Sequence, residues 1–388
     1  MAWQTELENF TQEDDASVKA TVRNANGEIE TIEAKFLVGC DGAKSAVRHA
    51  LGLTFEGSTF ERLFYVADVE VDWQLSHDAL TVFLLKNNLL VFFPMRGERH
   101  HRIVGTFPEE FAKDEGEVLY EEIEERIKQD AEIKLDITDV KWFSTYKVHT
   151  RRVNKFSADR CFLAGDSAHV HTPAGAQGMN TGIQDGYNLA WKIALVLNAK
   201  ASERILETYN EERLENAENL LKTTDRLFSF VTSPDVFLSY FRTRVFPYIA
   251  GAAFNLDAVK KFVFPRISQI GISYRHSSLS DTQENFPVKA GDRMPYFTVE
   301  GASVYDKLRE PKFHLLTFYD GSGNLPDFSE TEFSELTDFH RLPLYPHIAK
   351  LFGANESFMA LLRPDNYIGF ISSEISATVL KRYFEQNY

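Results

Sequence analysis

The sequence predicts an α/β fold, and three stretches of the chain carry that prediction. Residues 160–192 begin with the apolar run Cys161–Ala164, which has the length of a strand, and end in a pattern of apolar residues at three- and four-residue steps that is typical of a helix. Residues 35–48 form a second apolar run that ends in an Asp-Gly turn. Residues 55–107 hold several short strand patterns. Strand, loop and helix therefore recur along the chain.

The composition limits the size, the partners and the compartment of the protein. The chain has 388 residues, enough for two or three domains, and its net charge of -15 argues against nucleic acid and anionic membranes as partners. We see no apolar run long enough to span a bilayer and no secretory segment after Met1. Cys40 and Cys161 lie in apolar runs, so we expect buried, reduced thiols in a cytoplasmic protein. We find no cluster with metal-ligand spacing and no Gly-x-Ser-x-Gly elbow of a hydrolase.

The strongest functional signal follows the apolar run at Cys161. The strand ends at Gly165-Asp166, and Pro173, Gly175 and Gly178 interrupt regular structure before the helix begins. A helix start carries free backbone N–H groups and partial positive charge, so it suits an anion or an electron-rich ring edge. Glycines allow a flat ligand to approach the backbone, and Asp166 is placed to accept hydrogen bonds from sugar-like hydroxyls. The simpler alternative is a glycine-rich turn between a strand and a core helix.

A second motif follows the apolar run at residues 35–40. Asp41-Gly42 ends this run, and Ser45 and Arg48 lie in the turn that follows. An Asp-Gly turn alone is ordinary loop chemistry. An arginine can pair with phosphate through two hydrogen bonds, whereas the structural alternative is an Arg–Asp pair within the turn.

Both motifs resemble those of the FAD-dependent aromatic hydroxylases, which are monooxygenases of the para-hydroxybenzoate and phenol hydroxylase type. The earlier motif reads Asp-Gly-x-x-Ser-x-Val-Arg. Ala176 and Gly186 depart from the later motif, where the family commonly has Gly and Ala. The matching positions of the later motif are Gly165, Asp166, Ala168, His169, Pro173, Gly175, Gln177, Gly178, Asn180, Gly182, Asp185, Asn188, Leu189, Trp191 and Lys192.

The resemblance implies a function and a set of binding residues. It implies hydroxylation of a small aromatic, phenolic molecule with FAD as cofactor, NAD(P)H as reductant and O₂. It further implies that the Asp of the later motif holds the flavin ribityl chain, that the Pro and the helix start lie beside the isoalloxazine ring, and that the earlier motif lies near the pyrophosphate and serves NAD(P)H use. No catalytic acid or base is assigned. The cofactor-binding residues predicted in this way are Asp41, Gly42, Ser45, Arg48, Gly165, Asp166, Pro173, Gly175, Gly178, Met179 and Asn180.

The resemblance also predicts four parts of the chain. Residues 1–54 are the remnant of an FAD-binding domain with the Asp-Gly motif, and residues 55–150 are an inserted β-sheet substrate domain. Residues 151–284 continue the FAD-binding domain with the Gly-Asp motif and helices. Residues 285–388 form a thioredoxin-like C-terminal domain, which we expect to fold separately and to support a homodimer. This domain has no Cys-x-x-Cys, which argues against a redox role for it.

One expected motif is missing from the sequence. A dinucleotide-binding fold normally opens with a strand, Gly-x-Gly-x-x-Gly and a helix, and we find no such motif in the 388 residues. We therefore expect an N-terminally truncated version of the fold. Two functions stay open: a monooxygenase, and a non-catalytic truncated homologue that cannot hold FAD without a missing N-terminal segment or a partner. A flavin spectrum of the purified chain would distinguish them.

The remaining pattern predicts the other elements. Asn26-Gly27 is a strong hairpin signal, and the basic cluster at residues 99–102 is predicted to be a solvated loop. Residues 273–287 are polar and read as a linker. Helices are predicted at 117–129, 202–230, 304–308 and 375–385, further helices up to about 272, strands at 140–149 and 313–319, and a hairpin at 361–370.

Overall fold

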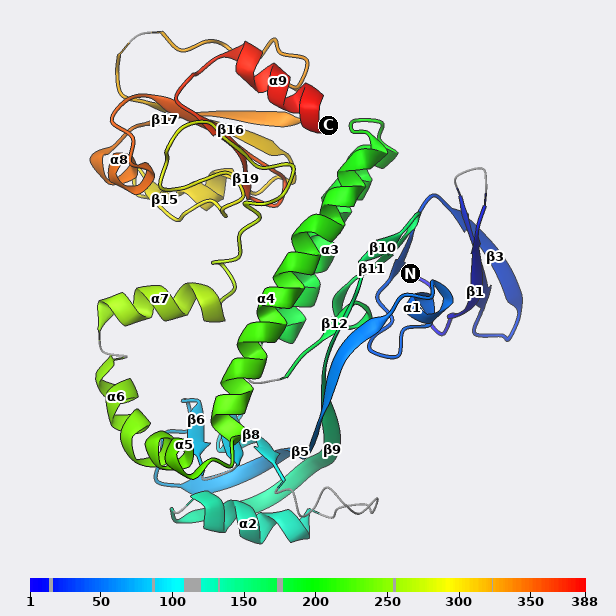
Figure 1. Ribbon diagram of the computed structural model, residues 1–388, viewed down its shortest axis with the longest axis vertical. Helices are drawn as coiled ribbons and strands as arrows, with labels where there is room; N and C mark the ends of the chain where they lie inside the picture. The colour runs from blue at the N-terminus through cyan, green and yellow to red at the C-terminus, as the bar shows by residue number, and fades with distance from the viewer. Residues whose placement is uncertain are drawn as a thin grey trace.

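The computed structural model describes residues 1–13, 17–85, 88–107, 120–131, 133–172, 177–253, 256–322 and 324–388. Two long helices, α3 (Gly178–Leu197) and α4 (Glu207–Thr232), run side by side along the middle of the molecule. A large β-sheet lies at one end of these helices and the C-terminal domain at the other, as Figure 1 shows. The helix predicted at 202–230 is confirmed, with its first turn formed by the 3₁₀ segment Glu203–Leu206.

The chain begins with a small antiparallel sheet. The strands β1 (Glu6–Gln12), β2 (Val18–Arg23) and β3 (Ile29–Ala34) follow one another, and the hairpin predicted at Asn26-Gly27 joins the last two. Gly27 has a φ of +82°, a conformation that favours glycine in such a turn. The next strand, β4 (Leu37–Gly39), leaves this sheet and belongs to a different one.

The strands β4 and β11 form the small parallel sheet that carries both predicted motifs. β11 (Cys161–Leu163) pairs in parallel with β4, and β10 (Ser157–Ala158) pairs antiparallel with β11. Leu163 lies opposite Gly39, so the two strands end at the same level. Because both strands end at the same edge of the sheet, the loops that follow them come together.

The large sheet has the strand order β12-β9-β5-β8-β7-β6. Its two longest strands, β5 (Phe55–Trp73) and β9 (Leu135–Val153), are antiparallel partners and connect the parallel sheet to the far end of the molecule. Helix α2 (Glu121–Ala131) covers it with Ile123 and Ile127; residues 117–119 of the predicted helix lie outside the described residues. The remaining strands are β6 (Thr81–Leu84), β7 (Leu89–Pro94), β8 (His100–Thr106) and β12 (His169–Val170).

Two expectations about polar residues were wrong. Most of the basic cluster at residues 99–102 is not a solvated loop, because β8 begins at His100 and alternation places His101 in the core, beside Trp73. Cys40 is exposed, because it follows the last residue of β4 and its side chain leaves the sheet, whereas Cys161 is buried as expected. Both cysteines are free thiols.

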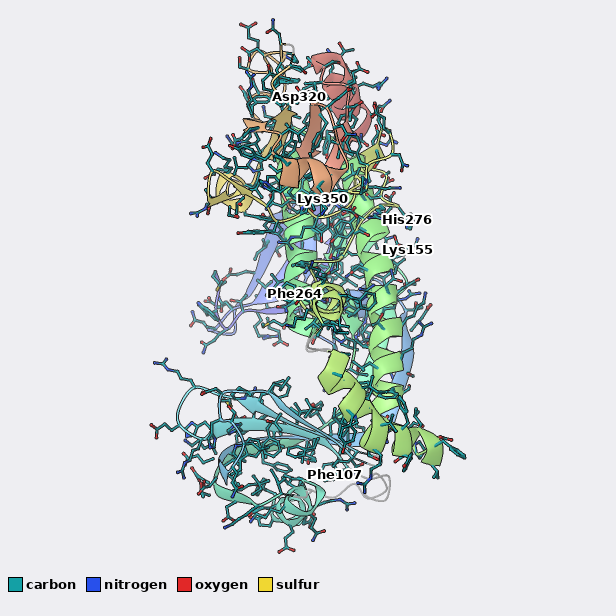
Figure 2. All side chains as sticks on the ribbon, turned by 90° about the vertical axis from the view of Figure 1, so that its left-hand side faces the viewer. Phe107, Lys155, Phe264, His276, Asp320 and Lys350 are labelled. Carbon is teal, nitrogen blue, oxygen red and sulfur yellow. The ribbon has the colours of Figure 1, made fainter. Side chains whose placement is uncertain are left out.

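The helices after α4 carry an unusual amount of exposed apolar surface. They are α5 (Val236–Tyr240), a π-helical turn (Phe241–Val245), α6 (Phe246–Ala253) and α7 (Asp257–Ile267). Phe237 is 86% exposed, Tyr248 80% and Phe264 63%. Figure 2 shows Phe264 between the sheet that carries Phe107 and the domain that carries Asp320 and Lys350. We call this surface of residues 236–267 the apolar helix surface.

The C-terminal domain is a mixed sheet with a helix on each face. The strand order is β13-β19-β18-β16-β17, with β16 (Phe313–Tyr319) and β17 (Thr337–Pro343) parallel. Helix α8 (Pro346–Phe352) packs on one face and α9 (Ala377–Asn387) on the other. The other elements are β13 (Asp281–Thr282), β14 (Thr298–Val299), β15 (Ala302–Ser303), a 3₁₀ turn (Val304–Lys307), β18 (Phe358–Leu362) and β19 (Ile368–Ser372).

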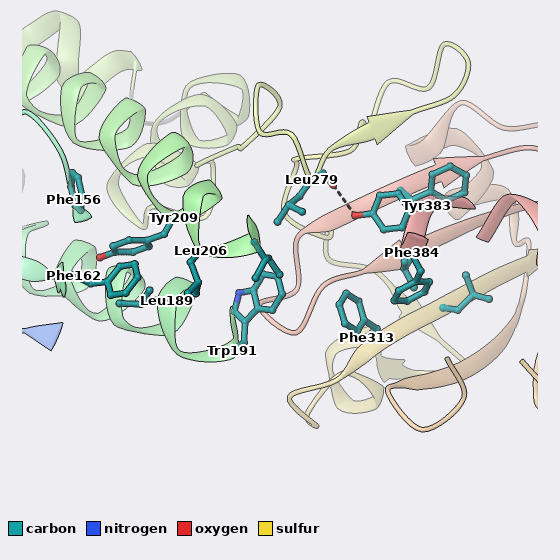
Figure 3. Packing of buried hydrophobic residues seen from close by; sticks show 14 of the residues in the cluster. Phe156, Phe162, Leu189, Trp191, Leu206, Tyr209, Leu279, Phe313, Tyr383 and Phe384 are labelled. Atoms are coloured by element: carbon teal, nitrogen blue, oxygen red, sulfur yellow. Dashed lines mark hydrogen bonds between the residues drawn. The ribbon is translucent and has the colours of Figure 1, made fainter. Parts of the chain in front are cut away.

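One hydrophobic core joins the C-terminal domain to α3 and α4. It includes Phe162 and Leu189 on one side and Phe313 and Phe384 on the other. Trp191 of α3 lies between them, and its ring meets that of Phe313 edge-on at 6.2 Å, as Figure 3 shows. The core therefore does not stop at the expected boundary near residue 284.

The predicted linker at residues 273–287 is packed rather than free. Tyr274 and Leu279 are buried, and the backbone oxygen of Leu279 accepts a hydrogen bond from the Tyr383 hydroxyl at 2.7 Å. The segment also carries β13, which pairs in parallel with β19. A polar composition misled the prediction because some of these polar groups, such as the Ser277 and Ser280 hydroxyls, form hydrogen bonds within the protein.

Candidate functional site

The two predicted motifs meet where β4 and β11 end. The Ser167 hydroxyl donates to the backbone oxygen of Gly39 at 2.6 Å, and the Ala164 amide donates to the same oxygen at 3.0 Å. From the other side, the Arg48 guanidinium donates to the backbone oxygen of Ser167 at 2.9 Å. The sequence places these motifs more than one hundred residues apart, and the parallel pairing of the strands brings them together.

The Asp-Gly motif is organised around the N-terminus of the short helix α1 (Ala46–Ala50). The Ser45 hydroxyl caps this helix by accepting the Arg48 amide at 2.9 Å, and the Asp41 carboxylate accepts the Val47 amide at 3.1 Å. Gly42 has a φ of +79°, and the space where its side chain would lie is open. Asp41 and Ser45 thus shape the turn, and Gly42 leaves room above it.

Arg48 is only 2% exposed, and its guanidinium is engaged inside the protein. Besides Ser167, it donates to the backbone oxygen of Ala43 at 2.8 Å and stacks on the ring of Phe55 at 4.0 Å. Burial lowers the pKa of Arg48, while the nearby Asp41 carboxylate acts in the opposite direction. The residue therefore ties the two motifs together through backbone carbonyls, instead of forming the simple Arg–Asp pair of the structural alternative.

The later motif presents a free carboxylate. Its 3₁₀ turn, Gly165–Ser167, starts at Gly165 with a φ of +65°, and a side chain there would lie 3.7 Å from the Cα of Gly182 in α3. The loop therefore lies directly on that helix. Asp166, the next residue, is exposed, and no described residue donates a hydrogen bond to its carboxylate. This carboxylate is available to an external hydroxyl donor.

Among the described residues, the N-terminus of α3 also lacks a side-chain cap. Gln177 precedes the helix but does not cap it, because its side chain amide donates to the backbone oxygen of Arg266 at the end of α7. The first turn has no acidic residue, and Met179 is 78% exposed, with Asn180 exposed beside it. The free amides from Gly178 onward can therefore receive negative charge. Pro173 and Gly175 lie outside the described residues.

A buried ion cluster holds the later motif from below. The Asp185 carboxylate of α3 accepts the Gly165 amide at 2.9 Å and His169 Nε2 at 2.7 Å, and it accepts Arg213 Nε of α4 at 2.5 Å. Burial alone would raise the pKa of Asp185, but Arg213 and His169 hold it below its ordinary value. Asp185 is therefore an anion at neutral pH and fixes the amide that precedes Asp166.

Asp185 and Arg213 are residues that the sequence analysis did not assign to the site. A signal for them exists, because polar side chains recur along one face of α3 at helical spacing, at Thr181, Asp185, Asn188 and Lys192, and all four are buried. A polar stripe on the buried face of an otherwise apolar helix indicates buried partners. It does not reveal which partners, because they come from α4 and from the C-terminal domain.

Comparison with known proteins decides the family. A family model described as an FAD binding domain matches residues 1–224. A flavin-dependent monooxygenase of Mycobacteroides abscessus is 32% identical over 385 residues, covering 97% of this chain and 71% of that protein. Pentachlorophenol 4-monooxygenase of Sphingobium chlorophenolicum is 27% identical, covering 94% of this chain and 70% of its own.

The chain belongs to the FAD-dependent aromatic hydroxylase family. The hydroxylase fold is also found in a crystal structure of aklavinone-11 hydroxylase in a ternary complex with FAD and aklavinone, with a TM-score of 0.74 at 21% identity over 99% of this chain and 73% of that one. The predicted family and fold class are thereby confirmed, and with them the expectation of an enzyme of the flavin-dependent monooxygenase type.

The residues described fit a flavin dinucleotide in the hydroxylase. The exposed Asp166 carboxylate suits hydroxyl donors, the uncapped N-terminus of α3 suits an electron-rich edge, and Gly42 leaves the backbone accessible. Just before the helix, Nε2 of His171 is also buried and has no hydrogen-bond partner among the described residues. Among the described residues, no group of His, Cys, Asp and Glu could hold a metal ion, and no helix there could cross a bilayer.

Proposed function

We propose that this hydroxylase adds oxygen to a small phenolic molecule, with FAD as cofactor, NAD(P)H as reductant and O₂ as co-substrate. One observation carries the proposal: an unpaired carboxylate and an uncapped helix N-terminus meet at the edge where two parallel strands end. Relatives with similar chains are named as monooxygenases, and one of them as acting on pentachlorophenol. FAD, when bound, supplies the redox chemistry with the nicotinamide and O₂.

The protein's own residues bind and orient in this proposal. Asp166 accepts hydrogen bonds from sugar-alcohol hydroxyls, and Asp185 holds the Gly165 amide so that Asp166 projects outward. The amides of Gly178, Met179 and Asn180 stabilise negative charge at a ring edge placed over the start of α3. Asp41, Gly42, Ser45 and Arg48 shape the neighbouring turn. The roles of Pro173 and Gly175 stay predictions. The role of the Asp41-Gly42 motif in NAD(P)H use also stays a prediction.

The first experiment is an FAD titration with a matched control. Asp166→Ala should weaken FAD binding by roughly 1.5–3 kcal/mol, the value of a hydrogen bond to a charged group. Asp139→Ala should leave the affinity unchanged, because that carboxylate is exposed on β9, far from the loop. Equal affinities for the native chain and Asp166→Ala would contradict the role of Asp166.

The second experiment tests the reaction itself. The FAD-loaded chain should oxidise NADH or NADPH faster in the presence of a phenol than in its absence, and mass spectrometry should find one added oxygen atom in the product. A native chain that stays colourless and binds no FAD would favour the non-catalytic alternative. FAD binding without any hydroxylated product, across a panel of phenols, would limit the proposal to cofactor binding.

A further inference from the structure

Two consecutive residues of α4 bind different parts of the molecule. Glu212 and Arg213 are both fully buried. The Glu212 carboxylate accepts both terminal nitrogens of Arg363, at 2.5 and 3.1 Å, from the turn between β18 and β19 of the C-terminal domain. Arg213 donates to Asp185, which holds the Gly165 amide of the cofactor loop. A chain of buried charges thus runs from the C-terminal domain to the loop that carries Asp166.

Arg363, where this series of buried charges begins, is held by further partners. Arg363 donates to Asp365 at 2.5 and 3.0 Å, and Asp365 accepts the indole N–H of Trp191 in α3 at 3.2 Å. The Tyr187 hydroxyl, also on α3, donates to the backbone oxygen of Pro364 at 3.0 Å. The turn is therefore seated against α3 and cannot rotate without breaking several buried bonds.

Tyr274 provides a second connection between the Glu212–Arg363 pair and the Arg213–Asp185 pair. Its hydroxyl accepts Arg213 Nη1 at 2.7 Å, and its ring stacks on Tyr367 at 4.4 Å between centroids. The Arg363 guanidinium lies 5.3 Å from the centre of the same ring. Movement of Arg363 therefore disturbs both the Glu212 carboxylate, next to Arg213 in sequence, and the Tyr274 hydroxyl, which Arg213 binds.

We infer that Arg363, in the C-terminal domain, is a positioning residue for the cofactor loop. Through Glu212 and Arg213 it fixes Asp185, and through Asp185 it fixes the backbone of Gly165 and the direction of the Asp166 carboxylate. A buried charge cluster tolerates little displacement, because a half-satisfied cluster is less stable than either a complete or an apolar one. The inference rests on the proposed function only for what Asp166 binds.

The test is amide hydrogen exchange on the full chain without cofactor. Arg363→Met removes the hydrogen bonds to both Glu212 and Asp365, and it should speed exchange in the segment 161–172 by about tenfold if the loop loses support equivalent to one charged hydrogen bond. The segment 121–131 of α2, which lies in the distant sheet, should stay unchanged. Arg363→Lys, which keeps the charge, should restore part of the protection. The control Arg309→Met removes an exposed arginine of the same domain, which pairs with Asp306 in the described part of the chain, and should change neither segment.

Faster exchange confined to the C-terminal domain in Arg363→Met, with 161–172 as protected as in the native chain, would overturn the inference. If that variant fails to fold, the native chain supplies the test: in graded urea, segments 161–172 and 358–372 should lose protection with the same slope, and different slopes would overturn it. Both measurements need no flavin. FAD titration then adds a separate result, because Arg363→Met should weaken binding about tenfold, while a native chain that binds no FAD would contradict only the proposed function.

Discussion

Burial decides what each charged residue near the loops can do. Asp166 is exposed and unpaired among the described residues, so it can receive a ligand, whereas Arg48 is buried and spends its donors on two backbone carbonyls. Glu212 is the extreme case, because its carboxylate accepts hydrogen bonds from four buried side chains. The four donors are Asn188, Lys192, Ser277 and Arg363.

Glu212→Gln should lower the free energy of unfolding by about 3–5 kcal/mol at pH 7, because two buried cations lose their shared counter-charge. Burial alone would raise the pKa of Glu212, but Arg363 and Lys192 hold it well below its ordinary value of 4.5. The carboxylate thus stabilises the fold above pH 4.5, and this contribution is lost as the pH falls below that value. The difference between variant and native chain should therefore shrink in acid.

Urea unfolding between pH 7 and pH 3 measures this difference. Glu335→Gln is the control, because Glu335 forms an exposed ion pair with Lys200 and should leave stability nearly unchanged at every pH. A gap between Glu212→Gln and the native chain that stays constant from pH 7 to pH 3 would show that the carboxylate does not act as an anion there.

In the same cluster the lowered pKa favours the charged form of Glu212, whereas it favours the neutral form of Lys192. Burial lowers its pKa to about 8, although the Glu212 carboxylate acts against this shift. The resemblance named Lys192 among the matching positions, but the sequence analysis did not identify the buried polar face of α3 that carries it. Neither identified the ion-pair partner, because Glu212 lies on a different helix and Arg363, which shares the Glu212 carboxylate, lies 171 positions after Lys192.

At the scale of elements, strands were predicted where the pattern was long or alternating. The strand 313–319 and the hairpin at Asn26-Gly27 were predicted correctly, because turn chemistry and apolar runs mark them locally. The segment 99–102 was predicted wrongly, since its basic residues pair across the sheet with Glu70 and Asp68 of β5. Cross-strand partners are distant in sequence, so local composition cannot reveal them.

The long pair β5 and β9 passes a narrow point at Gly57. A side chain at this position would lie 2.0 Å from the backbone oxygen of Thr150, and Gly57 has a φ of +142°. Gly57→Ala should lower the free energy of unfolding by about 2–5 kcal/mol, combining backbone strain with overpacking against β9.

Chemical denaturation measures this effect against a second glycine variant. Gly186→Ala lies on an exposed face of α3 with open space around it, and it should raise stability by about 0.5–1 kcal/mol. Equal stabilities for Gly57→Ala and the native chain would show that β9 can retreat from β5 without loss.

For the whole molecule, the family resemblance predicted the order of the parts but not how they adhere. The polar composition of residues 273–287 suggested a linker, and the resemblance implied a separately folding C-terminal domain, whereas Leu189, Trp191, Phe313 and Phe384 share one core. The resemblance describes each part by its own motif. Contacts between parts depend on side chains such as Trp191 and Arg363, whose partners no motif specifies.

The shared core predicts one cooperative unfolding transition for residues 151–388. Scanning calorimetry should show the C-terminal domain and the helices α3 and α4 melting together, because each covers apolar surface of the other. Tryptophan fluorescence, to which Trp191 contributes, and far-ultraviolet circular dichroism should give the same midpoint. Two separate transitions would show that the domain interface is weaker than its buried contacts indicate.

The apolar helix surface leads to a prediction about association. Phe237, Tyr248 and Phe264 lie exposed on helices that bury none of their described side chains. Such surfaces mark contact sites or promote aggregation. Phe237→Ser with Phe264→Ser should reduce self-association in sedimentation velocity at high concentration, whereas Phe328→Ser, a buried position, should reduce stability instead. Unchanged sedimentation of the double variant would show that this surface is not where copies meet.

The turn Arg363–Asp365 also limits which C-terminal domains could replace the one in this chain. A foreign C-terminal domain without an arginine at this turn would leave the buried Glu212 carboxylate without one of its two cationic partners. A foreign domain with the arginine but without the aspartate would leave the Trp191 indole N–H unpaired. In this chain, a replacement domain joined at the segment 273–287 should therefore restore stability only if it brings both residues.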